Sequence, residues 1–271
     1  MDNVYCYIIN LEYETEKHNK METLVNESGM RAIFIDAIVG AKLTERDLNK
    51  YYDKSRAKLI IGRELTVGEI GCALSHLVIY EKILKSKKGY GLVLEDDTSF
   101  RFSSRDLESI VSELPSDWEC VLLGHHDKFS RGTEALTSIK YRKRINDRIY
   151  VGRFVERAAG GYGYLISANG AAKRMKEFAT IRYPIDYWIA GKINLYGIVP
   201  PIINIADEYV IGSRLDSERE NATYEVSRFR QIKNFVIKFI IISKFIYIYL
   251  CFRKIILRRR KLKPYKQNKS K

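Results

Sequence analysis

Apolar runs and amphipathic segments alternate along the first part of the chain. Residues 4–11 are mostly β-branched and aromatic, the charged segment after them has Met21 and Val25 at helical spacing, and residues 32–37 are again apolar except for Asp36. β-Branched and aromatic side chains fit a pleated strand, and Gly29 is suited to ending the helix. Strand, helix and strand at this spacing predict a βαβ unit with two parallel strands.

The next segments predict a long helix followed by a buried strand. Residues 65–77 open an amphipathic helix that runs to about Lys85, and Thr66 with Glu69 has the capping-box pattern at its start. Residues 91–97 then begin as a continuous apolar run. Because a strand buried on both faces is apolar throughout, this run predicts a central strand of a parallel sheet.

Three acids, Glu95, Asp96 and Asp97, close this apolar run. Open α/β sheets bind ligands beyond the carboxyl ends of their strands. Gathered carboxylates repel one another unless a cation or donor lies among them, and hard oxygen ligands suit Mg²⁺ or Mn²⁺. We therefore predict a divalent ion here that carries a phosphorylated substrate. The alternative is a solvated acidic turn, since acids are usually exposed.

The rest of the chain continues the α/β pattern. We expect helices over residues 44–52, capped by Thr44, over 104–114, capped by Ser104, from about residue 169, and after Asp186. We expect strands over residues 118–124, 160–167 and 199–203. Residues 128–146 are polar and predict a loop that can include edge strands.

The net charge of +14 is concentrated at the C-terminal end of the chain. Residues 228–271 contain 15 Lys and Arg and no Asp or Glu, which leaves 32 basic and 33 acidic residues in 1–227. The body is therefore close to neutral, which argues against a basic face for nucleic acid. We expect one folded domain over residues 1–227 and a basic, apolar tail over residues 228–271.

The tail has the composition of a membrane-surface helix. Residues 235–257 are nearly all apolar but are interrupted by four Lys and Arg residues, and the longest uncharged run, 245–252, is too short to span a bilayer. A basic amphipathic helix on anionic lipid fits better, each basic residue adding about 1 kcal/mol. The alternatives are packing on its own domain or dimerisation; RNA fits poorly with so many Ile and Phe.

Cysteine usage and the first residues of the chain bear on location. The cysteines are scattered without metal-ligand or CxxC spacing, which favours a reduced cytosolic chain: Cys6, Cys72, Cys120 and Cys251. No apolar stretch behind a basic start opens the sequence, so we do not expect a cleaved secretion signal. The expected location is the cytoplasm, with the tail at the inner face of the cytoplasmic membrane.

Six stretches of the chain carry a family resemblance: residues 8–11, 36–40, 65–76, 92–97, 163–167 and 184–186. Together, and in this order over about residues 4–215, they resemble glycosyltransferase family 25, the lipooligosaccharide and collagen-type galactosyltransferases. The segment 65–76 followed by the acidic strand end is the most specific part. Residues 12–20 depart from the family's arginine-rich stretch, which leaves the diphosphate contacts there open.

The resemblance implies an α/β fold of the GT-A-like, Rossmann-like kind, with a single catalytic domain around a mostly parallel sheet. It also implies a UDP-sugar or similar donor and, usually, Mn²⁺ (or Mg²⁺) bound through an Asp-x-Asp-type motif. That motif corresponds here to residues 95–97, with Asp97 as the direct metal ligand and Glu95 nearer the ribose or a metal-bound water.

The resemblance further implies an inverting transfer, which needs a carboxylate to accept the proton of the acceptor hydroxyl. Asp186 is the candidate, because Pro184 fixes the approach and a helix is expected to start there. The alternative is that Asp186 only caps that helix. Asp207 and Glu208 are the substitutes.

Other candidate site residues are also carried over from the family. The expected donor contacts are Asn10, Leu11, Ala37, Glu69, Ser75, His76, Glu95 and Asp96. The acceptor candidates come from the residues themselves. His125 and His126 follow a strand end and could serve the acceptor or a third metal position, or simply lie in a loop. Tyr162 and Tyr164 offer flat faces to a sugar, Asp207 is a further acceptor candidate, and Gly160, Gly161 and Gly163 allow close backbone approach. A lone helical histidine is more often structural, and strand aromatics more often belong to the core.

These features predict a bacterial-type cytosolic glycosyltransferase. It would move a hexose, with galactose as the first candidate, from a UDP-sugar to a lipid-linked lipooligosaccharide or lipopolysaccharide acceptor. Two other classes stay open. A metal-dependent phosphohydrolase could use the same acids, and a nucleic-acid-associated protein could use the basic arm, although the neutral body does not support it. The oligomeric state is also left open.

Overall fold

The computed structural model describes residues 4–127, 135, 137–154, 158–189, 192–209 and 218. The chain divides into two compact units, residues 1–223 and 224–271. The whole of the second unit, and with it the membrane-surface prediction for the tail, lies outside the described residues. The architecture below is that of the first unit.

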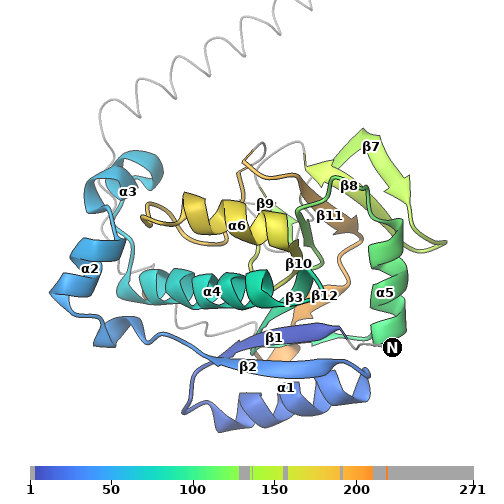
Figure 1. The fold of residues 1–271 in the computed structure, drawn as a ribbon, viewed down its shortest axis with the longest axis horizontal. Helices are drawn as coiled ribbons and strands as arrows, with labels where there is room; N and C mark the ends of the chain where they lie inside the picture. Colours follow the sequence, from blue (N-terminus) through green and yellow to red (C-terminus); the bar gives the residue numbers. More distant parts are fainter. Residues whose placement is uncertain are drawn as a thin grey trace, which may run out of the picture. The chain divides into compact units, whose positions relative to one another are not determined.

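Within the described residues, eight strands form a central sheet in the order β2-β1-β3-β10-β5-β11-β8-β7 (Figure 1). The neighbouring strands β2, β1 and β3 are parallel, as are β5 and β11. β10 and β8 run against their neighbours. The sheet strands are β1 (Tyr5–Asn10), β2 (Arg31–Asp36), β3 (Tyr90–Glu95), β5 (Cys120–Leu122), β7 (Thr137–Arg144), β8 (Tyr150–Phe154), β10 (Gly163–Ser167) and β11 (Leu195–Val199). The expected mixed α/β fold with mostly parallel strand direction is confirmed.

The predicted βαβ unit opens the fold. Helix α1 (Thr15–Glu27) connects the parallel strands β1 and β2, and its Met21 and Val25 are buried. Gly29 follows with φ of 75°, a left-handed conformation that glycine adopts without the usual steric cost. The helix therefore ends where the sequence indicated.

Helices cover both faces of the sheet (Figure 1). Helices α4 (Val67–Lys85) and α6 (Ala168–Glu177) lie side by side on one face, in a core with Tyr7 and Val93. Helices α1 and α5 (Ser104–Glu113) contribute to the other core, with Ile8 and Leu92. Successive residues of β1 and β3 thus enter different cores, which is why these strands are apolar throughout.

The start of α4 is held as its sequence predicts. The Thr66 hydroxyl accepts from the Glu69 N–H at 3.1 Å, and the Glu69 carboxylate accepts from the Thr66 N–H at 3.0 Å. Gly71 lies so close to the turn after β2 that a Cβ there would come within 2.3 Å of the Ile38 carbonyl oxygen. This contact accounts for a glycine that is otherwise unfavourable in a helix. It places the carboxyl end of β2 against α4.

The remaining elements are short. Helix α2 (Glu45–Tyr51) has Thr44 as its predicted cap, whereas α3 (Lys54–Ile61) was not expected from the sequence. The others are η1 (Gly40–Lys42), β4 (Thr98–Phe100) paired with β12 (Ile203–Ile205), β6 (His126–Asp127) paired with β9 (Ala158–Ala159), and η2 (Asp207–Tyr209). Among the helices that the structure describes, none is long and apolar enough to cross a bilayer.

Three local predictions are corrected. Ser103, not Ser104, caps α5, since its hydroxyl accepts from the Asp106 N–H at 3.2 Å. The strand expected over 199–203 is instead the junction of β11 and β12, because Pro200 and Pro201 have no N–H for a sheet ladder. The helix expected after Asp186 is not present in the described residues 182–189, which form turns and bridges.

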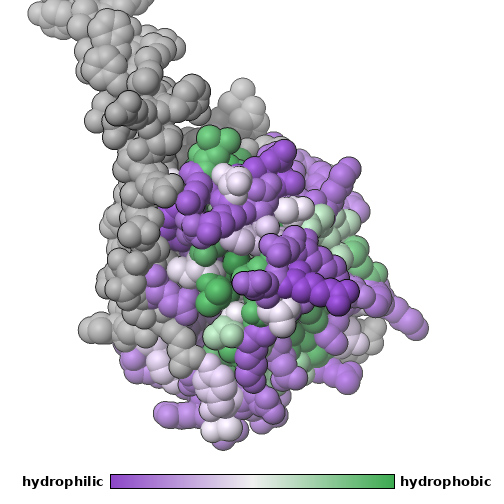
Figure 2. Space-filling view, turned by 90° about the vertical axis from the view of Figure 1, so that its left-hand side faces the viewer, coloured by the Kyte–Doolittle hydropathy of each residue, from purple (hydrophilic) through white to green (hydrophobic). Residues whose placement is uncertain are grey.

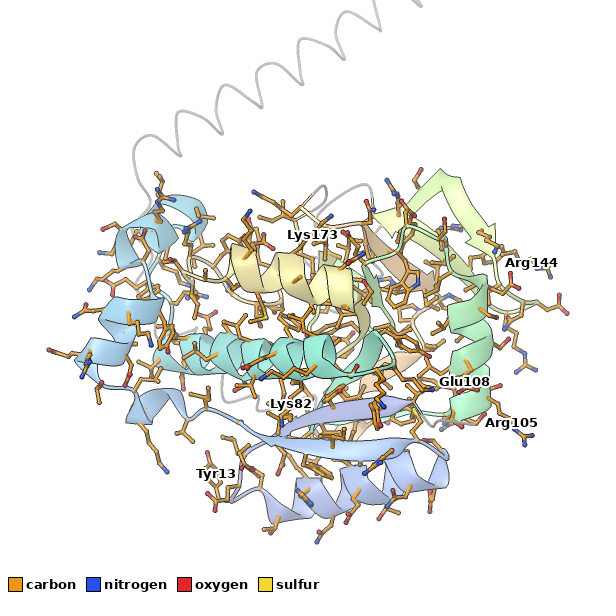
Figure 3. The ribbon with its side chains drawn as sticks, in the orientation of Figure 1. Tyr13, Lys82, Arg105, Glu108, Arg144 and Lys173 are labelled. Carbon is orange, nitrogen blue, oxygen red and sulfur yellow. The ribbon has the colours of Figure 1, made fainter. Side chains whose placement is uncertain are left out.

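The carboxyl ends of β1, β2 and β3 meet at one edge of the sheet, on the left of Figure 1 and toward the viewer in Figure 2. Hydrophilic side chains dominate this face, with individual apolar residues among them (Figure 2). Tyr13 lies near this edge in Figure 3, whereas Arg105, Glu108 and Arg144 lie at the opposite one.

Candidate active site

Two neighbouring clefts lie at the carboxyl-end edge of the sheet. The acid cleft is lined by the carboxylates of Glu69, Glu95, Asp97 and Asp186 and by His126 and Tyr162. The apolar cleft is lined mainly by the ends of β1 and β2 and by the start of α4. Glu95 and Cys72 line both clefts, so they form the wall between them.

The turn after β3 distributes its three acids between the clefts. Glu95 and Asp97 line the acid cleft, whereas Asp96 lines the apolar cleft. The turn is held by main-chain bonds: the Glu95 N–H donates to the Tyr162 carbonyl at 3.0 Å, and the Asp97 carbonyl accepts from the Ala206 N–H at 2.8 Å. Strands far apart in sequence therefore fix the position of the acidic motif.

Asp96 is bonded to the first βα turn. Its carboxylate accepts from the Asn10 side-chain amide at 2.9 Å and from the Lys17 ammonium at 3.4 Å. Burial alone would lower the pKa of Lys17, but the charges of Asp96, Glu14 and Asp97 and the hydrogen bond to Asp96 together outweigh it, and the pKa is raised. A charged lysine thus lines the apolar cleft, within the segment of mixed charge where the sequence left the diphosphate contacts open.

Asp186 lines the acid cleft together with the acids at the end of β3. A Cβ added at Gly161 would lie 3.2 Å from the Asp186 Cβ and 3.6 Å from the Glu95 Oε1, so both acids approach the same glycine. The turn that carries Asp186 is fixed by Arg174, whose buried guanidinium donates to the Ile185 carbonyl at 2.5 Å. Since no helix begins at Asp186 in the described residues, the helix-cap alternative does not apply.

Glu69 lines the acid cleft but is held by a cation of its own chain. Its two carboxylate oxygens accept from the Arg63 guanidinium at 2.6 and 2.7 Å, and both side chains are buried. Together with the capping bond to Thr66, this pair ties the loop before α4 to the helix. Glu69 therefore supports the wall of the cleft.

The other expected donor contacts gather around the apolar cleft. Leu11 and Ala37 line it directly. Ser75 also lines it, and its hydroxyl accepts from the Ile38 N–H and donates to the Gly71 carbonyl, both at 2.8 Å. Ser75 thus holds the turn after β2 against α4 and shapes the cleft.

His76 lies behind the wall that separates the clefts. It is fully buried, and its Nδ1 lies 2.6 Å from the Tyr164 hydroxyl, which is 2.9 Å from the Tyr80 hydroxyl. Burial, with the charge of Arg174, lowers the pKa of His76 to about 3, so the imidazole is neutral. Its Nε2 lies 4.0 Å from the Glu95 Oε1.

The expected acceptor residues separate into two groups. His126 and Tyr162 line the acid cleft. Their rings are nearly parallel, with ring centroids 6.5 Å apart. His125, by contrast, is buried and its Nε2 bonds the Ile198 carbonyl at 2.8 Å, which corrects its placement at the acceptor site. Tyr164 is likewise a core residue, and Asp207 lines a separate surface groove near Lys20. The substitute base Glu208 lies in that same groove and pairs with Lys20.

Four residues that shape the site were not found from the sequence as site residues. Arg63 and Arg174 are buried cations, and Lys17 and Cys72 line the clefts. An arginine or lysine in a charged segment has the same pattern whether it is solvated or buried, so the sequence carried no signal for the first three. Cys72 was visible only as part of the resemblance, one helical turn before His76.

The comparisons with known proteins agree with the motif. The family model described as glycosyltransferase family 25 (LPS biosynthesis protein) matches residues 3–189. A glycosyltransferase 25 family member of Aedes aegypti is 30% identical over 204 residues, covering 70% of this chain and 31% of that protein. Procollagen galactosyltransferase 1-A of Xenopus laevis is 25% identical, covering 68% of this chain and 30% of that protein.

A third relative has a name that describes it as probably inactive. A Bos taurus protein described as "Probable inactive glycosyltransferase 25 family member 3" is 27% identical, covering 68% of this chain and 30% of that protein. The chain therefore spans about a third of the length of the curated relatives it matches, and the activity of a relative does not transfer by name alone.

Proposed function

Because the chain belongs to glycosyltransferase family 25, we propose that it transfers a hexose, with galactose as the first candidate, from a UDP-sugar to a hydroxyl of a glycan acceptor. The proposed fold type is GT-A-like. The observation that carries the proposal is the convergence of Glu95, Asp97 and Asp186 on one cleft beside a second cleft suited to a nucleotide.

The residues of the acid cleft fit a divalent ion. Glu95 and Asp97 are hard oxygen donors at the end of one strand and line the same cleft, which is the donor chemistry that Mn²⁺ and Mg²⁺ prefer. When bound there, the ion would neutralise the departing nucleoside diphosphate.

Asp186 is proposed as the general base. The acceptor hydroxyl loses its proton to the Asp186 carboxylate while its oxygen forms a bond to the anomeric carbon. The bond from that carbon to the diphosphate oxygen breaks, and UDP leaves with the electron pair. Attack on the face opposite the leaving group inverts the anomeric configuration. The closeness of both Asp186 and Glu95 to Gly161 in the acid cleft supports this division of roles.

The apolar cleft is proposed to hold the nucleotide. Ile9, Leu11 and Ile38 offer apolar surface to a base, and Lys17 offers the positive charge that phosphate oxygens require. Asn10 would then act indirectly, since its amide is bonded to Asp96.

The acceptor is proposed to enter the acid cleft over His126 and Tyr162, whose stacked rings offer flat faces to a sugar. The proposed acceptors are a lipooligosaccharide or lipopolysaccharide, in line with the words "LPS biosynthesis" in the family description, and a collagen-type acceptor, in line with the name of the Xenopus relative. We favour the lipid-linked acceptor, because the basic, apolar tail suits a membrane surface.

One experiment tests the activity. The full chain is incubated with UDP-galactose, UDP-glucose and GDP-sugars, with and without Mn²⁺, in the presence of lipooligosaccharide or a hydroxylysine-containing collagen peptide. We expect metal-stimulated transfer from one UDP-hexose to the glycan. If UDP and free sugar are released and no sugar is transferred with either acceptor, the result would favour the phosphohydrolase class instead.

We further propose that the protein is cytoplasmic and binds the inner membrane surface through its tail. The full chain should sediment with anionic vesicles and not with neutral ones. A variant with Arg258, Arg259, Arg260 and Lys261 changed to Gln should bind anionic vesicles more weakly. Equal binding by both proteins would contradict the tail's role and favour packing or dimerisation.

A further inference from the structure

Three potential metal ligands from two elements meet in the wall between the clefts. The Cys72 sulfur, a His76 ring nitrogen and a Glu95 carboxylate oxygen all lie within 4.8 Å of one another. Cys72 and His76 are four residues apart on α4 and therefore share one face of the helix. That helix packs on β3, which ends at Glu95, so the fold itself brings the three together.

The imidazole of His76 is held in one orientation. Its ring stacks on the Tyr164 ring with centroids 5.7 Å apart, and its Nδ1 lies 2.6 Å from the Tyr164 hydroxyl. In the tautomer with its proton on Nδ1, the Tyr164 hydroxyl accepts from Nδ1 and donates to Tyr80, and the lone pair of Nε2 is available to an ion. Metal-binding histidines commonly have their other nitrogen fixed in this way.

The Nε2 atom of His76 needs an explanation. It is buried and has no hydrogen-bond partner among the described residues. The Glu95 Oε1 at 4.0 Å is too distant for a hydrogen bond. A buried polar atom left in this way commonly marks a water or an ion.

We propose that Cys72, His76 and Glu95 form a binding site for a thiophilic transition-metal ion of the Zn²⁺ class. Sulfur, nitrogen and oxygen donors together favour Zn²⁺ over Mg²⁺ or Mn²⁺. Tetrahedral Zn²⁺ at its usual bond lengths needs donor atoms about 3.3–3.6 Å apart. The Nε2–Oε1 separation is therefore only about half an ångström too long, and Glu95, whose side chain is 33% exposed, can close it by a small rotation.

The site has a route for entry. Cys72 and Glu95 line both clefts, so an ion can reach them from solvent. On binding, the Cys72 thiol loses its proton to solvent and the thiolate joins the ion. The site does not include Asp97, which distinguishes it from the hard-ion site proposed for catalysis.

Sharing Glu95 has a consequence that rests on the proposed function. An ion held by Cys72 and His76 would draw Glu95 out of the acid cleft. Zn²⁺ would then inhibit a Mn²⁺-dependent transfer, whereas binding of Zn²⁺ itself is independent of any activity.

Co²⁺ is the direct probe, because a cobalt–thiolate bond gives a near-ultraviolet charge-transfer band. The tag-free full chain, freed of metal with a chelator and kept reduced, is titrated with Co²⁺ and then Zn²⁺. We expect one equivalent of Co²⁺ to produce the band and Zn²⁺ to remove it. Cys72→Ser should lose the band and bind Zn²⁺ more than about 100-fold more weakly, whereas Cys251→Ser should keep both.

Two further variants separate this site from its neighbours. Tyr164→Phe removes the hydroxyl that orients His76 and should weaken Zn²⁺ binding by about 10–100-fold while the band remains. Asp97→Asn should leave Zn²⁺ affinity unchanged. Circular dichroism verifies that each variant is folded. A band that persists in Cys72→Ser, or Zn²⁺ affinity that falls with Asp97→Asn and not with Cys72→Ser, would overturn the assignment.

Discussion

Acidic residues lie at both edges of the central sheet, but their surroundings differ. At the amino end of β5, Asp117 bonds Arg153 and accepts from the Tyr196 hydroxyl at 2.7 Å, and Glu119 pairs with Lys173 at 2.6 Å. At the carboxyl end of β3, Glu95 and Asp97 line a cleft with Asp186. Asp117 and Glu119 join strands and helices through ion pairs with their own chain. Glu95, Asp97 and Asp186 line a cleft, where the charge of a ligand can reach them.

Glu69 shares one feature with the cleft acids and one with the paired acids. It lines the acid cleft, as the catalytic candidates do, but it is bound through both oxygens to Arg63, as the structural acids are. Position at a cleft therefore does not by itself assign a carboxylate to chemistry.

The largest effect is expected at Asp186. Asp186→Asn keeps the shape of the side chain but removes the proposed base, so transfer should fall by about 10²–10⁴-fold while donor affinity is retained. Initial transfer rates and UDP-sugar affinity measure the two effects. Asp117→Asn at the opposite edge is the matched control and should transfer at close to the wild-type rate. An Asp186→Asn enzyme as fast as that control would remove Asp186 from the mechanism.

The next effect concerns stability. Arg63→Met leaves the Glu69 carboxylate buried without its cation, which should cost about 3–5 kcal/mol of unfolding free energy in urea titrations. Arg153→Met breaks the exposed pair with Asp117 and should cost only about 0–1 kcal/mol. The double variant Arg63→Met, Glu69→Leu should recover most of the loss. Equal losses in the two single variants would show that burial of the Arg63–Glu69 pair does not matter.

A smaller effect is expected at the glycine between the cleft acids. In Gly161→Ala the new methyl group would press on the Asp186 Cβ at 3.2 Å, and a displacement of Asp186 by a few tenths of an ångström should slow transfer by about tenfold. Gly152→Ala is the control. Gly152 lies in β8, away from the clefts, and its added Cβ would meet the Thr137 side chain at 3.0 Å. Gly152→Ala should alter the unfolding midpoint and not the rate. Slower transfer in Gly152→Ala but not in Gly161→Ala would contradict the view that Gly161 leaves room for Asp186.

The smallest effect is a pH dependence at the amino-end edge. The Tyr196 hydrogen bond, with Arg153, lowers the pKa of Asp117 in the folded state. Its contribution to stability is therefore complete above the unfolded pKa of about 3.9 and is lost as pH falls through the folded value. Because Asp117 is half exposed, we expect less than about 1 kcal/mol. The difference in unfolding free energy between wild type and Asp117→Asn should shrink from pH 7 to pH 3; a constant difference would contradict this.

Local patterns predicted much of the fold. The βαβ unit, the capping box of α4 and the apolar strand that ends in acids each depend on neighbouring residues, so the sequence displays them directly. Helix α3 was missed because Lys54–Ile61 has little apolar periodicity, with a single buried residue, Ala57. The break between β11 and β12 follows from Pro200 and Pro201, which have no N–H to donate to a neighbouring strand. The apolar residues around them suggested one continuous strand.

The site was predictable in its acids and much less so in its supports. Glu95, Asp97 and Asp186 line one cleft, but the cations Arg63 and Arg174 acquire their roles only through tertiary packing. Adjacent residues also separate: His125 bonds a carbonyl in the core while His126 lines the acid cleft. Since neighbouring residues at a strand end point to opposite sides, only the register could decide between the two histidines.

We propose that the carboxylates at the end of β3 hold a divalent ion and, through it, the diphosphate of the donor. Calorimetric titration of UDP into the full chain, with and without Mn²⁺, tests it most directly when wild type and Asp97→Asn are compared. We predict that Mn²⁺ strengthens UDP binding to the wild type by about 5–150-fold and has little effect on Asp97→Asn. The same Mn²⁺ dependence in both proteins would contradict the account.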